Sequence, residues 1–343
     1  MSTNKIKILI VSLLAFFVLN SIAQRIVKQG KNKNGFYVDK RHVPFSSDNA
    51  YNHNMVLLGK KLFYDNKLSL TNNFSCASCH RAEYAFADTA TYSYSFITNK
   101  PLAYNTPSLV NLAYNRVYGY EGKYDNLEEF IKNHIANNEI MNMNNKAIIT
   151  HFSEDTTFTN YIKNTFNTDT FDSTIIYNAI SQYVRTFVSI NTSFEKELWS
   201  KKLIDSPDSL ILRVMFKNLS PKSQRTIDLC MLCHSGLAFG GEGTSNNGLN
   251  GDTENTIEYK TANIKNMQLT APYMHDGRFK TLEEVVEFYN SGIQYNKCLD
   301  PLLQENGKPI RLNLNNVEKK EIVKYLNTLM DSSYNTIYYN MRY

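Results

Sequence analysis

The stretch Leu58-Gly59-Lys60-Lys61-Leu62-Phe63-Tyr64-Asp65 leads through Leu68-Ser69 to Ser75-Cys76-Ala77-Ser78-Cys79-His80, and this segment decides the fold. Its end has the form C-x-x-C-H, in which two thiols add to the vinyl groups of haem and the adjacent histidine binds the iron. Two intervening residues let one turn present both sulfurs along one edge of the haem. The motif therefore predicts covalently attached haem, with Cys76 and Cys79 as attachment sites and His80 as an iron ligand.

A second copy of this motif, Cys230-Met231-Leu232-Cys233-His234, lies in the second half of the chain. A single C-x-x-C pair is also typical of a zinc site or a redox dithiol. Zinc needs four ligands, and neither half contains an obvious second C-x-x-C or H-x₃₋₅-H pair. Because the two copies use four of the five cysteines and both carry the histidine, the sequence favours two haem c groups. We expect the remaining Cys298 to be a buried structural thiol.

The composition indicates a globular protein with room for two cores. The chain has 343 residues, of which 42% are hydrophobic and 20% are charged, and this length is sufficient for two domains. The formal net charge of +5 is modest, and the sequence has no arginine-rich patch or nucleic-acid-binding motif. We therefore expect no nucleic acid among the partners.

The N-terminus has the features of an export signal. Lys5 and Lys7 precede an apolar run from Ile8 to Leu19, and Ser21-Ile22-Ala23 provides small residues for cleavage after Ala23. The run is short for a transmembrane helix, and an uncleaved anchor is the alternative. Export agrees with haem c, which bacteria attach outside the cytoplasmic membrane. We expect residues 1–23 to be a signal peptide and the protein to be periplasmic.

Helical periodicity dominates the rest of the chain, and no convincing alternation of period two is present. Apolar residues recur at helical spacing in about Tyr51 to Phe63, Asn126 to Ala136, Ile175 to Val188, Leu210 to Phe216 and Val317 to Met330. A further helix begins at the capping box Thr281-Leu282-Glu283-Glu284 and turns Tyr289 inward. Long turn-rich stretches follow each haem motif, and such loops are often functional.

These elements predict a mainly α protein with two haem domains in tandem and long irregular loops. Residues 24–50 are polar and read as a linker and an arm. The turn-forming residues Asp205-Ser206-Pro207-Asp208 place the domain boundary there. We expect a first haem domain at residues 51–205 and a second at residues 206–343.

The chain resembles the bacterial di-haem cytochrome c peroxidase and MauG family. The resemblance rests on L-G-x-x-L-F-x-D-x-x-L-S before the first haem motif, on Asn105-Thr106-Pro107-Ser108-Leu109-Val110-Asn111, and on Thr270-Ala271-Pro272-Tyr273-Met274-His275-Asp276-Gly277. It spans roughly residues 50 to 330. It implies two tandem cytochrome c-like domains whose haems face each other, the first peroxidatic and the second transferring electrons.

The resemblance also implies the metal ligands. His80 and His234 would be the proximal ligands of the first and second irons. A calcium ion would lie between the haems, bound by the Asn105 side chain and by the backbone carbonyls of Thr270 and Pro272. Calcium takes oxygen ligands and can fix the relative position of two domains. The alternative for Asn105 is an Asx turn.

On the side of the second haem opposite His234, the expected iron ligand is Tyr289. In the family this ligand is Met or, in MauG-like members, Tyr, fourteen residues beyond the histidine of P-Y-x-H-D-G. Counting from His275 reaches Tyr289. A tyrosine phenolate stabilises ferric iron and lowers the potential. The alternative is a core tyrosine on an amphipathic helix, and we expect Met274 to serve in packing.

The far side of the first haem is expected to be open. Some family members cap this iron with a histidine from the following loop, but no histidine occurs between His80 and His134. Peroxide cleavage needs a group that takes and returns a proton, and the family uses a Glu. Asn137-Asn138-Glu139-Ile140-Met141 resembles its N-P-x-E-M segment, with a shift of one residue. We therefore predict that Glu139 is the acid-base group. The alternative is that Glu139 is only a solvated carboxylate, and Glu121 and His134 are then the next candidates.

One departure from the family concerns electron transfer between the haems. Tyr120-Glu121-Gly122-Lys123 stands where the family has W-D-G-R, so Tyr120 occupies the position of the bridging Trp. Oxidation of a tyrosine requires loss of its proton. The single tryptophan, Trp199, shows no sign of the bridging role.

Three functions follow as hypotheses. The first is an exported di-haem peroxidase that reduces hydrogen peroxide to water with electrons from a small redox protein of the cytochrome c or cupredoxin type. The second is a MauG-like enzyme that oxidises side chains of a partner protein, which Tyr289 and the missing histidine favour. The third is a non-catalytic di-haem electron-transfer cytochrome. A homodimer is compatible with the resemblance.

Overall fold

The computed structural model describes residues 43–200, 218–235, 239–240, 243–251 and 257–334, and these residues form a mainly helical fold. The helices are α2 (His53–Phe63), α3 (Cys76–Cys79), α4 (Leu127–Ala136), α5 (Asn145–Ser153), α6 (Thr156–Phe166), α7 (Thr174–Arg185), α8 (Ser193–Ser200), α10 (Pro221–Cys233), α11 (Leu282–Glu287) and α12 (Asn316–Asn327). The strands form two antiparallel pairs, β1 (Thr244–Ser245) with β2 (Tyr259–Lys260) and β3 (Gln304–Glu305) with β4 (Lys308–Pro309). The predicted mainly α class is confirmed.

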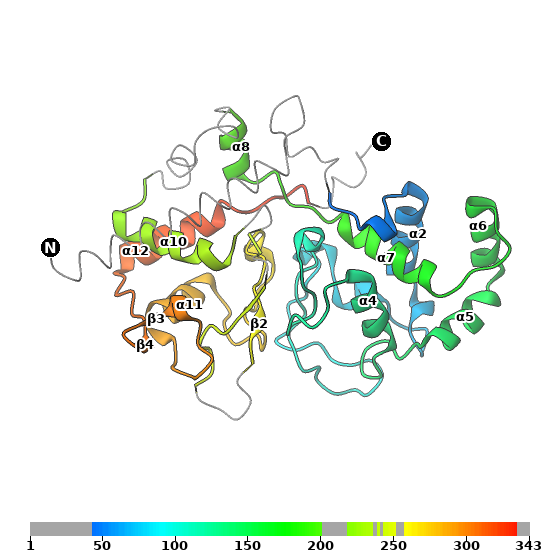
Figure 1. Ribbon diagram of the computed structural model, residues 1–343, viewed down its shortest axis with the longest axis horizontal. Coiled ribbons are helices and arrows are strands. Elements are labelled where there is room, and N and C mark those ends of the chain that lie inside the picture. The colour runs from blue at the N-terminus through cyan, green and yellow to red at the C-terminus, as the bar shows by residue number, and fades with distance from the viewer. Residues whose placement is uncertain (1–42, 201–217, 236–238, 241–242, 252–256, 335–343) are drawn as a thin grey trace.

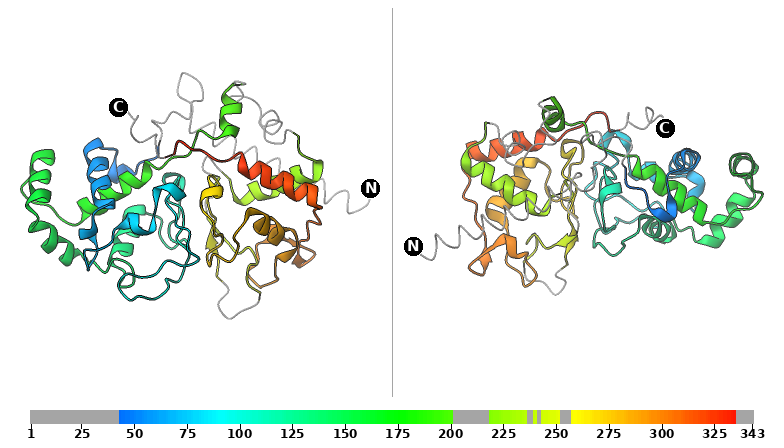
Figure 2. Two further views of the ribbon diagram at one scale, coloured as in Figure 1. Left: turned by 180° about the vertical axis from the view of Figure 1, so that it is seen from behind. Right: turned by 45° about the horizontal axis from the view of Figure 1, so that its top comes forward.

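Two lobes lie side by side (Figure 1). The first lobe, residues 43–190, contains α2 to α7, and the second lobe, residues 219–329, contains α10 to α12 and the strands. The views from behind and from above keep the same separation (Figure 2). Each lobe has its own buried apolar cluster, and the haem motifs α3 and the end of α10 belong to different lobes.

The first lobe is built on the contact of α2 with α7. Gly59, in the L-G-x-x-L-F motif, lets the two backbones approach so closely that a Cβ there would lie 1.9 Å from the Ala179 carbonyl oxygen. Leu58, Leu62 and Phe63 of α2 are almost fully buried against this contact. The glycine of the motif is therefore needed for helix packing rather than for chemistry.

α4 joins this pair through a buried ion pair. Arg185 at the end of α7 donates from Nη2 to Glu128 Oε2 at 3.0 Å, and only 6% and 13% of the two side chains are exposed. Asn49 and Ser181 donate to the same carboxylate, at 2.6 and 2.7 Å. The charges are thus paired and hydrogen-bonded, which a buried carboxylate requires.

In the second lobe, α10 packs on α12 around a small polar residue. Ser223 of α10 is fully buried, and its hydroxyl donates to Glu321 Oε2 at 2.7 Å. Ile227, Ile322 and Tyr325 complete the apolar contact.

A buried polar network joins the lobes. Lys265 of the second lobe has no exposed side-chain surface; its Nζ pairs with Glu195 of α8 and donates to the Ser189 carbonyl oxygen at 2.9 Å. On the other side, Asn111 Oδ1 accepts from the Ser189 N–H at 2.7 Å. The chain segment that connects the lobes is therefore bonded to both of them.

The chain returns to the first lobe after α12. Tyr334 packs in the first apolar cluster, and its hydroxyl donates to the Ala82 carbonyl oxygen at 2.6 Å and accepts from the Ala85 N–H at 3.2 Å. Figure 1 shows this segment crossing above the junction of the lobes.

Several elements differ from the sequence predictions. α5 and α6 are helices that the sequence reading did not identify, and α7 ends at Arg185 because residues 188–192 run in extended form between the lobes. Cys298 is partly exposed in a turn, so the prediction of a buried thiol is wrong. The signal peptide, most of the 24–50 arm, the 205–208 boundary and the 210–216 helix lie outside the described residues, as does the Trp199 side chain. Among the helices described here, none combines the length and apolarity that a bilayer span requires.

Candidate functional site

α3 presents the first haem motif as a single turn. A capping box opens it, with the Ser75 N–H donating to Ser78 Oγ at 3.0 Å. His80 closes it, and the His80 N–H donates to the Cys76 carbonyl oxygen at 2.9 Å. His80 Nδ1 lies 2.8 Å from the Phe86 carbonyl oxygen. With the proton on Nδ1, this bond fixes the ring and leaves Nε2 free for a metal.

The second motif ends α10 with the same geometry. The His234 N–H donates to the Cys230 carbonyl oxygen at 2.9 Å, and His234 Nδ1 lies 2.8 Å from the Ala262 carbonyl oxygen. That carbonyl comes from 28 residues away, whereas Phe86 is six residues from His80. Two unrelated loops thus orient the two histidines alike.

The thiols and a nearby amine fit covalent haem. None of the five cysteines is in a disulfide. Burial raises the pKa of the Cys76 and Cys230 thiols to about 12, so both are neutral thiols at neutral pH. Burial lowers the pKa of Lys260, in the second lobe, to about 8. The only hydrogen bond that the Lys260 ammonium makes to the described residues is to the Thr261 carbonyl oxygen at 3.2 Å, so this ammonium suits a haem propionate.

Tyr289 faces the second haem motif from a π-helical segment, Phe288–Gly292, that continues α11. Such π turns often occur at functional sites. Burial raises the pKa of Tyr289 to about 12, with smaller effects from Cys230 and Cys233, which places the phenol within electrostatic reach of both attachment cysteines. Asn247 Nδ2 donates to the Tyr289 hydroxyl at 3.3 Å.

Met274 shares the same amide donor. As expected, it packs in an apolar cluster, together with Phe279. Its sulfur also lies 3.7 Å from Asn247 Nδ2. The Met274 backbone has φ of +74°, a conformation that is strained for any residue with a Cβ. Two side chains that can bind iron therefore approach one point in the second lobe.

The candidate acid-base residues of the first lobe have different surroundings. His134 of α4 packs against Phe130, with tilted rings and centroids 5.5 Å apart, and its ring makes no hydrogen bond to the described residues. Burial and the nearby His80 lower the pKa of His134 to about 4. Glu139 lies just beyond α4 in an exposed turn, where its backbone N–H donates to Asn137 Oδ1 at 2.8 Å. His134 therefore lies near His80, whereas Glu139 lies at the surface.

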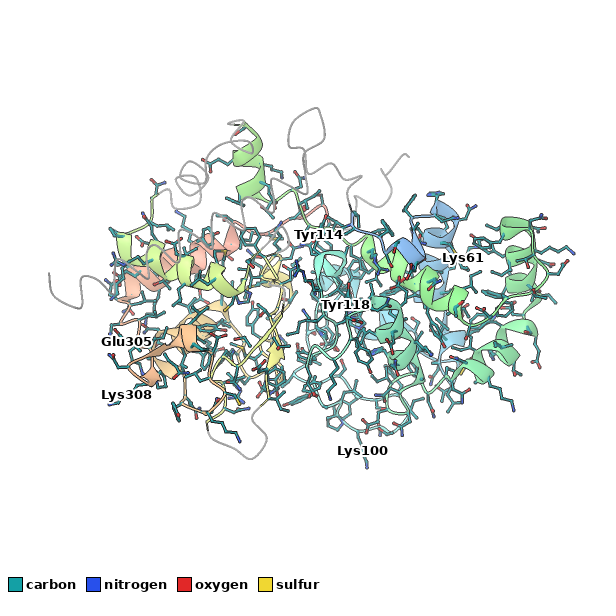
Figure 3. All side chains as sticks on the ribbon, viewed as in Figure 1. Lys61, Lys100, Tyr114, Tyr118, Glu305 and Lys308 are labelled. Carbon is teal, nitrogen blue, oxygen red and sulfur yellow. The ribbon has the colours of Figure 1, made fainter. Side chains whose placement is uncertain are left out.

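Two hairpins of related sequence meet between the lobes. They are Tyr118-Gly119-Tyr120-Glu121-Gly122-Lys123-Tyr124 and Tyr273-Met274-His275-Asp276-Gly277-Arg278-Phe279. In each, the first and last residues form an isolated antiparallel bridge. The second and fifth residues have positive φ, +77° and +63° in the first hairpin and +74° and +61° in the second. Tyr118, at the start of the first hairpin, lies on the side of its lobe that faces the second (Figure 3).

The hairpins are equivalent in charge and contacts as well. Glu121 pairs with Lys123 at 2.6 Å, and the Arg278 Nε donates to Asp276 Oδ2 at 2.7 Å. Each hairpin also bonds to the other lobe: the Lys260 N–H donates to the Tyr120 carbonyl oxygen at 2.7 Å, and the Asn105 N–H donates to the His275 carbonyl oxygen at 2.8 Å. By this equivalence Tyr120 corresponds to His275.

Four rings from these segments form what we call the interlobe aromatic cluster: Tyr104, Tyr120, Tyr259 and His275. Tyr104 packs on Tyr120 with ring centroids 4.7 Å apart, and Tyr259 stacks on His275 at 4.2 Å. Tyr104 also lies 6.2 Å from both Tyr259 and His275. The cluster therefore connects the lobes through aromatic contacts.

The hydroxyl groups of the cluster have different partners. Tyr120 donates to the Asn105 carbonyl oxygen at 2.7 Å, and Tyr104 donates to Glu121 Oε1 at 2.8 Å. Lys123 and Tyr104 hold the pKa of Glu121 below its usual range. Glu121, one of the alternative candidates for the acid-base group, is therefore bonded to the interlobe aromatic cluster.

The predicted calcium ligands come from both lobes and lie close together. Asn105 is buried, and its Nδ2 donates to the Ala90 and Thr91 carbonyl oxygens at 2.8 and 3.3 Å. Its Oδ1 accepts no hydrogen bond from the described residues, which suits a cation. Thr270 and Pro272 flank the cis Ala271–Pro272 bond, just before His275, whose carbonyl oxygen accepts the Asn105 N–H.

The hairpin repeat and the Tyr104–Glu121 contact were not recognised in the sequence. A signal was present, since Y-G-Y-E-G-K-Y and Y-M-H-D-G-R-F match in aromatic, acidic, glycine and basic positions. The two matching segments are short and begin 155 residues apart in the chain. Only their shared backbone conformation makes the repeat evident.

Comparisons with known proteins agree with this geometry. Residues 53–202 match the family model of di-haem cytochrome c peroxidase. Methylamine utilization protein MauG of Methylorubrum extorquens is 25% identical over 301 residues, covering 84% of this chain and 81% of the relative. Cytochrome c551 peroxidase of Nitrosomonas europaea is 27% identical, covering 71% of this chain and 75% of the relative.

A solved structure supports the fold over nearly the whole length. A MauG-like protein associated with microbial copper homeostasis superposes with a TM-score of 0.69 at 22% identity, covering 88% of this chain and 97% of that one. The diheme peroxidase BthA of Burkholderia thailandensis gives 0.63 at 18% identity, covering 87% and 90%. The two haem motifs, the sequence relatives and the shared fold agree with one another: this chain is similar to the di-haem cytochrome c peroxidase family, whose model matches residues 53–202.

Proposed function

We propose that the protein is an exported, periplasmic di-haem peroxidase that reduces hydrogen peroxide to water with electrons from a small redox protein. The observation that carries the proposal is the pair of C-x-x-C-H turns, each with its histidine oriented by a backbone carbonyl, on two lobes in contact. The curated relatives include proteins named cytochrome c peroxidases. We further propose that residues 51–205 and 206–343 form two tandem cytochrome c-like domains.

The two sites differ in what faces the histidine. When bound, haem supplies an iron that exchanges electrons with peroxide and with a donor. His80 and His234 would hold the two irons. Tyr289 would be a further iron ligand in the second lobe, which suits that site to electron storage. In the first lobe we propose that the iron is left accessible to peroxide, because the loop after His80 offers no second histidine before His134.

The proton transfer at the first site has two candidates on one segment. We propose Glu139 as the group that takes a proton from the near oxygen of peroxide and returns it to the leaving oxygen. His134 is the second candidate, because its ring is desolvated, lacks a hydrogen-bond partner among the described residues, and lies within reach of His80. A neutral imidazole is ready to accept a proton at neutral pH.

Calcium would fix the two lobes at the position where the hairpins meet. The Asn105 side-chain oxygen and the carbonyl oxygens of Thr270 and Pro272 are the proposed ligands, and oxygen donors of this kind suit Ca²⁺. Chelation should reversibly slow electron exchange between the haems. Normal exchange in calcium-free protein would remove this proposal.

Peroxide turnover and a spectrum test the function. Holoprotein supplied with a reduced cytochrome c or a reduced cupredoxin should oxidise the donor on addition of peroxide, two equivalents for each peroxide. The oxidised protein should show one high-spin and one low-spin haem before any reduction. Absence of donor oxidation with either donor would overturn the peroxidase assignment, and two low-spin haems would overturn the open first site.

Tyr289 favours a second function, the oxidation of side chains on a partner protein. An anionic phenolate ligand stabilises an oxidised iron, which suits storage of oxidising equivalents for a slow protein substrate. Tyr289→Phe should change the low-spin signal of the second haem, whereas Met274→Leu should not. If only Met274→Leu changes it, Met274 is the ligand and this second function loses its support.

A further inference from the structure

The interlobe aromatic cluster contains one tyrosine that is bonded to a carboxylate. We propose that Tyr104 and Glu121 form a proton-coupled redox pair, in which Tyr104 is oxidised to a neutral radical while Glu121 holds its proton. This inference rests on the proposed peroxidase function, which supplies the oxidant. It assigns electron relay between the lobes to Tyr104, a residue outside the haem motifs and beside the position of the bridging tryptophan.

The hydrogen-bond partners separate Tyr104 from its neighbours. A tyrosine cannot be oxidised at moderate potential unless its phenolic proton moves to a base at the same time. Tyr120 donates to a backbone carbonyl oxygen, which cannot keep a proton. Tyr259 has no hydroxyl partner among the described residues. Only Tyr104 donates to a carboxylate, at 2.8 Å from Glu121 Oε1.

The position of the pair suits a relay. Tyr104 contacts Tyr120 of its own lobe at 4.7 Å and both Tyr259 and His275 of the other lobe at 6.2 Å. It therefore touches equivalent members of both hairpins, each of which lies beside one haem site. The Glu121 side chain is 27% exposed and is fixed by Lys123, and Tyr104 is itself only partly buried, so the proton-accepting carboxylate of the pair reaches the surface.

The step balances with peroxide as oxidant. Reduction of one hydrogen peroxide to two waters consumes two electrons and two protons. Tyr104 gives one electron to the oxidised haem pair, its O–H bond breaks, and the proton moves to Glu121 Oε1. The donor protein then returns one electron to Tyr104, and the proton comes back from Glu121 to the phenol oxygen. No bond between heavy atoms forms or breaks.

Freeze-quench electron paramagnetic resonance on the holoprotein tests the pair. Wild-type protein mixed with hydrogen peroxide, without donor, should give a tyrosyl radical, identified by the narrowing of its signal in protein grown on ring-deuterated tyrosine. Tyr104→Phe should abolish it. Glu121→Gln keeps the size and the hydrogen-bond acceptor but removes the base, and it should lower the radical yield about tenfold or more.

Variants outside the Tyr104–Glu121 pair provide the controls. Tyr259→Phe changes another ring of the interlobe aromatic cluster, whose hydroxyl has no partner among the described residues, and Asp276→Asn changes the carboxylate that corresponds to Glu121 in the second hairpin. Both should leave the radical yield unchanged. Haem content and circular dichroism of each variant establish that it is folded, and peroxide consumption is recorded on the same samples.

The outcomes separate the inference from the proposed function. Peroxide consumption without a tyrosyl radical, or a radical that survives in Tyr104→Phe, overturns the redox pair alone. Full yield in Glu121→Gln overturns the role of the carboxylate as proton acceptor. A wild-type protein that consumes no peroxide overturns the peroxidase function and the pair together.

Discussion

The two haem sites are alike on one side and different on the other. Both motifs end a helix, both histidine N–H groups donate to the carbonyl oxygen of the first cysteine, and both rings are oriented by a carbonyl oxygen at 2.8 Å. The surrounding side chains differ: in the second lobe Tyr289 and Met274 both contact Asn247, whereas in the first His134 lies near His80 without a hydrogen-bond partner among the described residues. The two lobes thus share the histidine geometry and differ in the residues around it.

The two hairpins show that the lobes differ at few sequence positions in this region. At its second position the first hairpin has Gly119 and the second has Met274, both with positive φ. Glycine adopts this conformation freely, whereas methionine is strained there. Met274 thus adopts a strained backbone conformation where its side chain meets Asn247.

The largest expected effect comes from removing one attachment site at a time. Cys76→Ser with Cys79→Ser should leave one haem, with peroxide turnover lost, because the first lobe then has no attached iron. Cys230→Ser with Cys233→Ser should also leave one haem, with the high-spin signal kept. Haem content and spectra measure both. If the first pair of substitutions left the high-spin signal and turnover intact, the assignment of the two sites would have to be exchanged.

The acid-base of the first site should show the next largest effect. Loss of a positioned proton-transfer group lowers turnover by about 10²–10⁴-fold. Glu139→Gln and His134→Gln should therefore differ sharply in steady-state peroxide turnover at unchanged haem content. Glu129→Gln, an exposed carboxylate on the outer face of α4, is the matched control. If neither Glu139→Gln nor His134→Gln reduces turnover, another group transfers the proton and both assignments are wrong.

Ion pairs give a third contrast between the lobes. Although burial works to raise it, Arg185 with Asn49 and Ser181 holds the pKa of Glu128 below its usual 4.5. A lowered folded pKa means stabilisation that is present above pH 4.5 and is lost as the pH falls through the folded value. Glu128→Gln should cost about 3 kcal/mol at pH 7, because it leaves Arg185 buried and unpaired.

Glu287 is the exposed counterpart in the second lobe. Lys319, Ser291 and Asn290 lower the pKa of Glu287 to about 2, but 45% of its side chain is exposed. Glu287→Gln should cost less than about 1 kcal/mol, and this cost should disappear only as the pH falls from 4.5 toward about 2. Urea unfolding of both variants at pH 7 and pH 4 measures the contrast. Equal losses would contradict the difference in burial.

Helix packing should give the smallest difference. Gly59→Ala places a Cβ against the Ala179 carbonyl oxygen and should cost about 2 kcal/mol, because α2 and α7 must separate. Ser223→Ala in the α10–α12 contact removes one hydrogen bond to Glu321 and should cost about 1 kcal/mol. Thermal unfolding of the holoprotein compares them. A larger loss for Ser223→Ala would show that the second lobe depends more on its buried polar contact.

The sequence predicted the parts that local pattern determines. The C-x-x-C-H turns, the Thr281 capping box and α4 behind Asn126 follow from short-range spacing, and the structure has them. α5 and α6 were missed, although each has a buried apolar pair at helical spacing, Ile148 with Phe152 and Phe158 with Ile162. The Tyr104–Glu121 contact and the pairing of hairpins depend on how the two lobes meet, which no local pattern specifies.

The end of the described chain has a consequence for how the protein can be divided. Tyr334 bonds to Ala82 and Ala85, in the loop whose Phe86 carbonyl orients His80. A segment beyond α12 therefore supports the loop that follows the first haem motif, 249 residues back along the chain. A fragment that ends at the linker between the lobes would contain every residue of the first motif. It would still lack Tyr334, whose hydroxyl bonds to the loop after that motif.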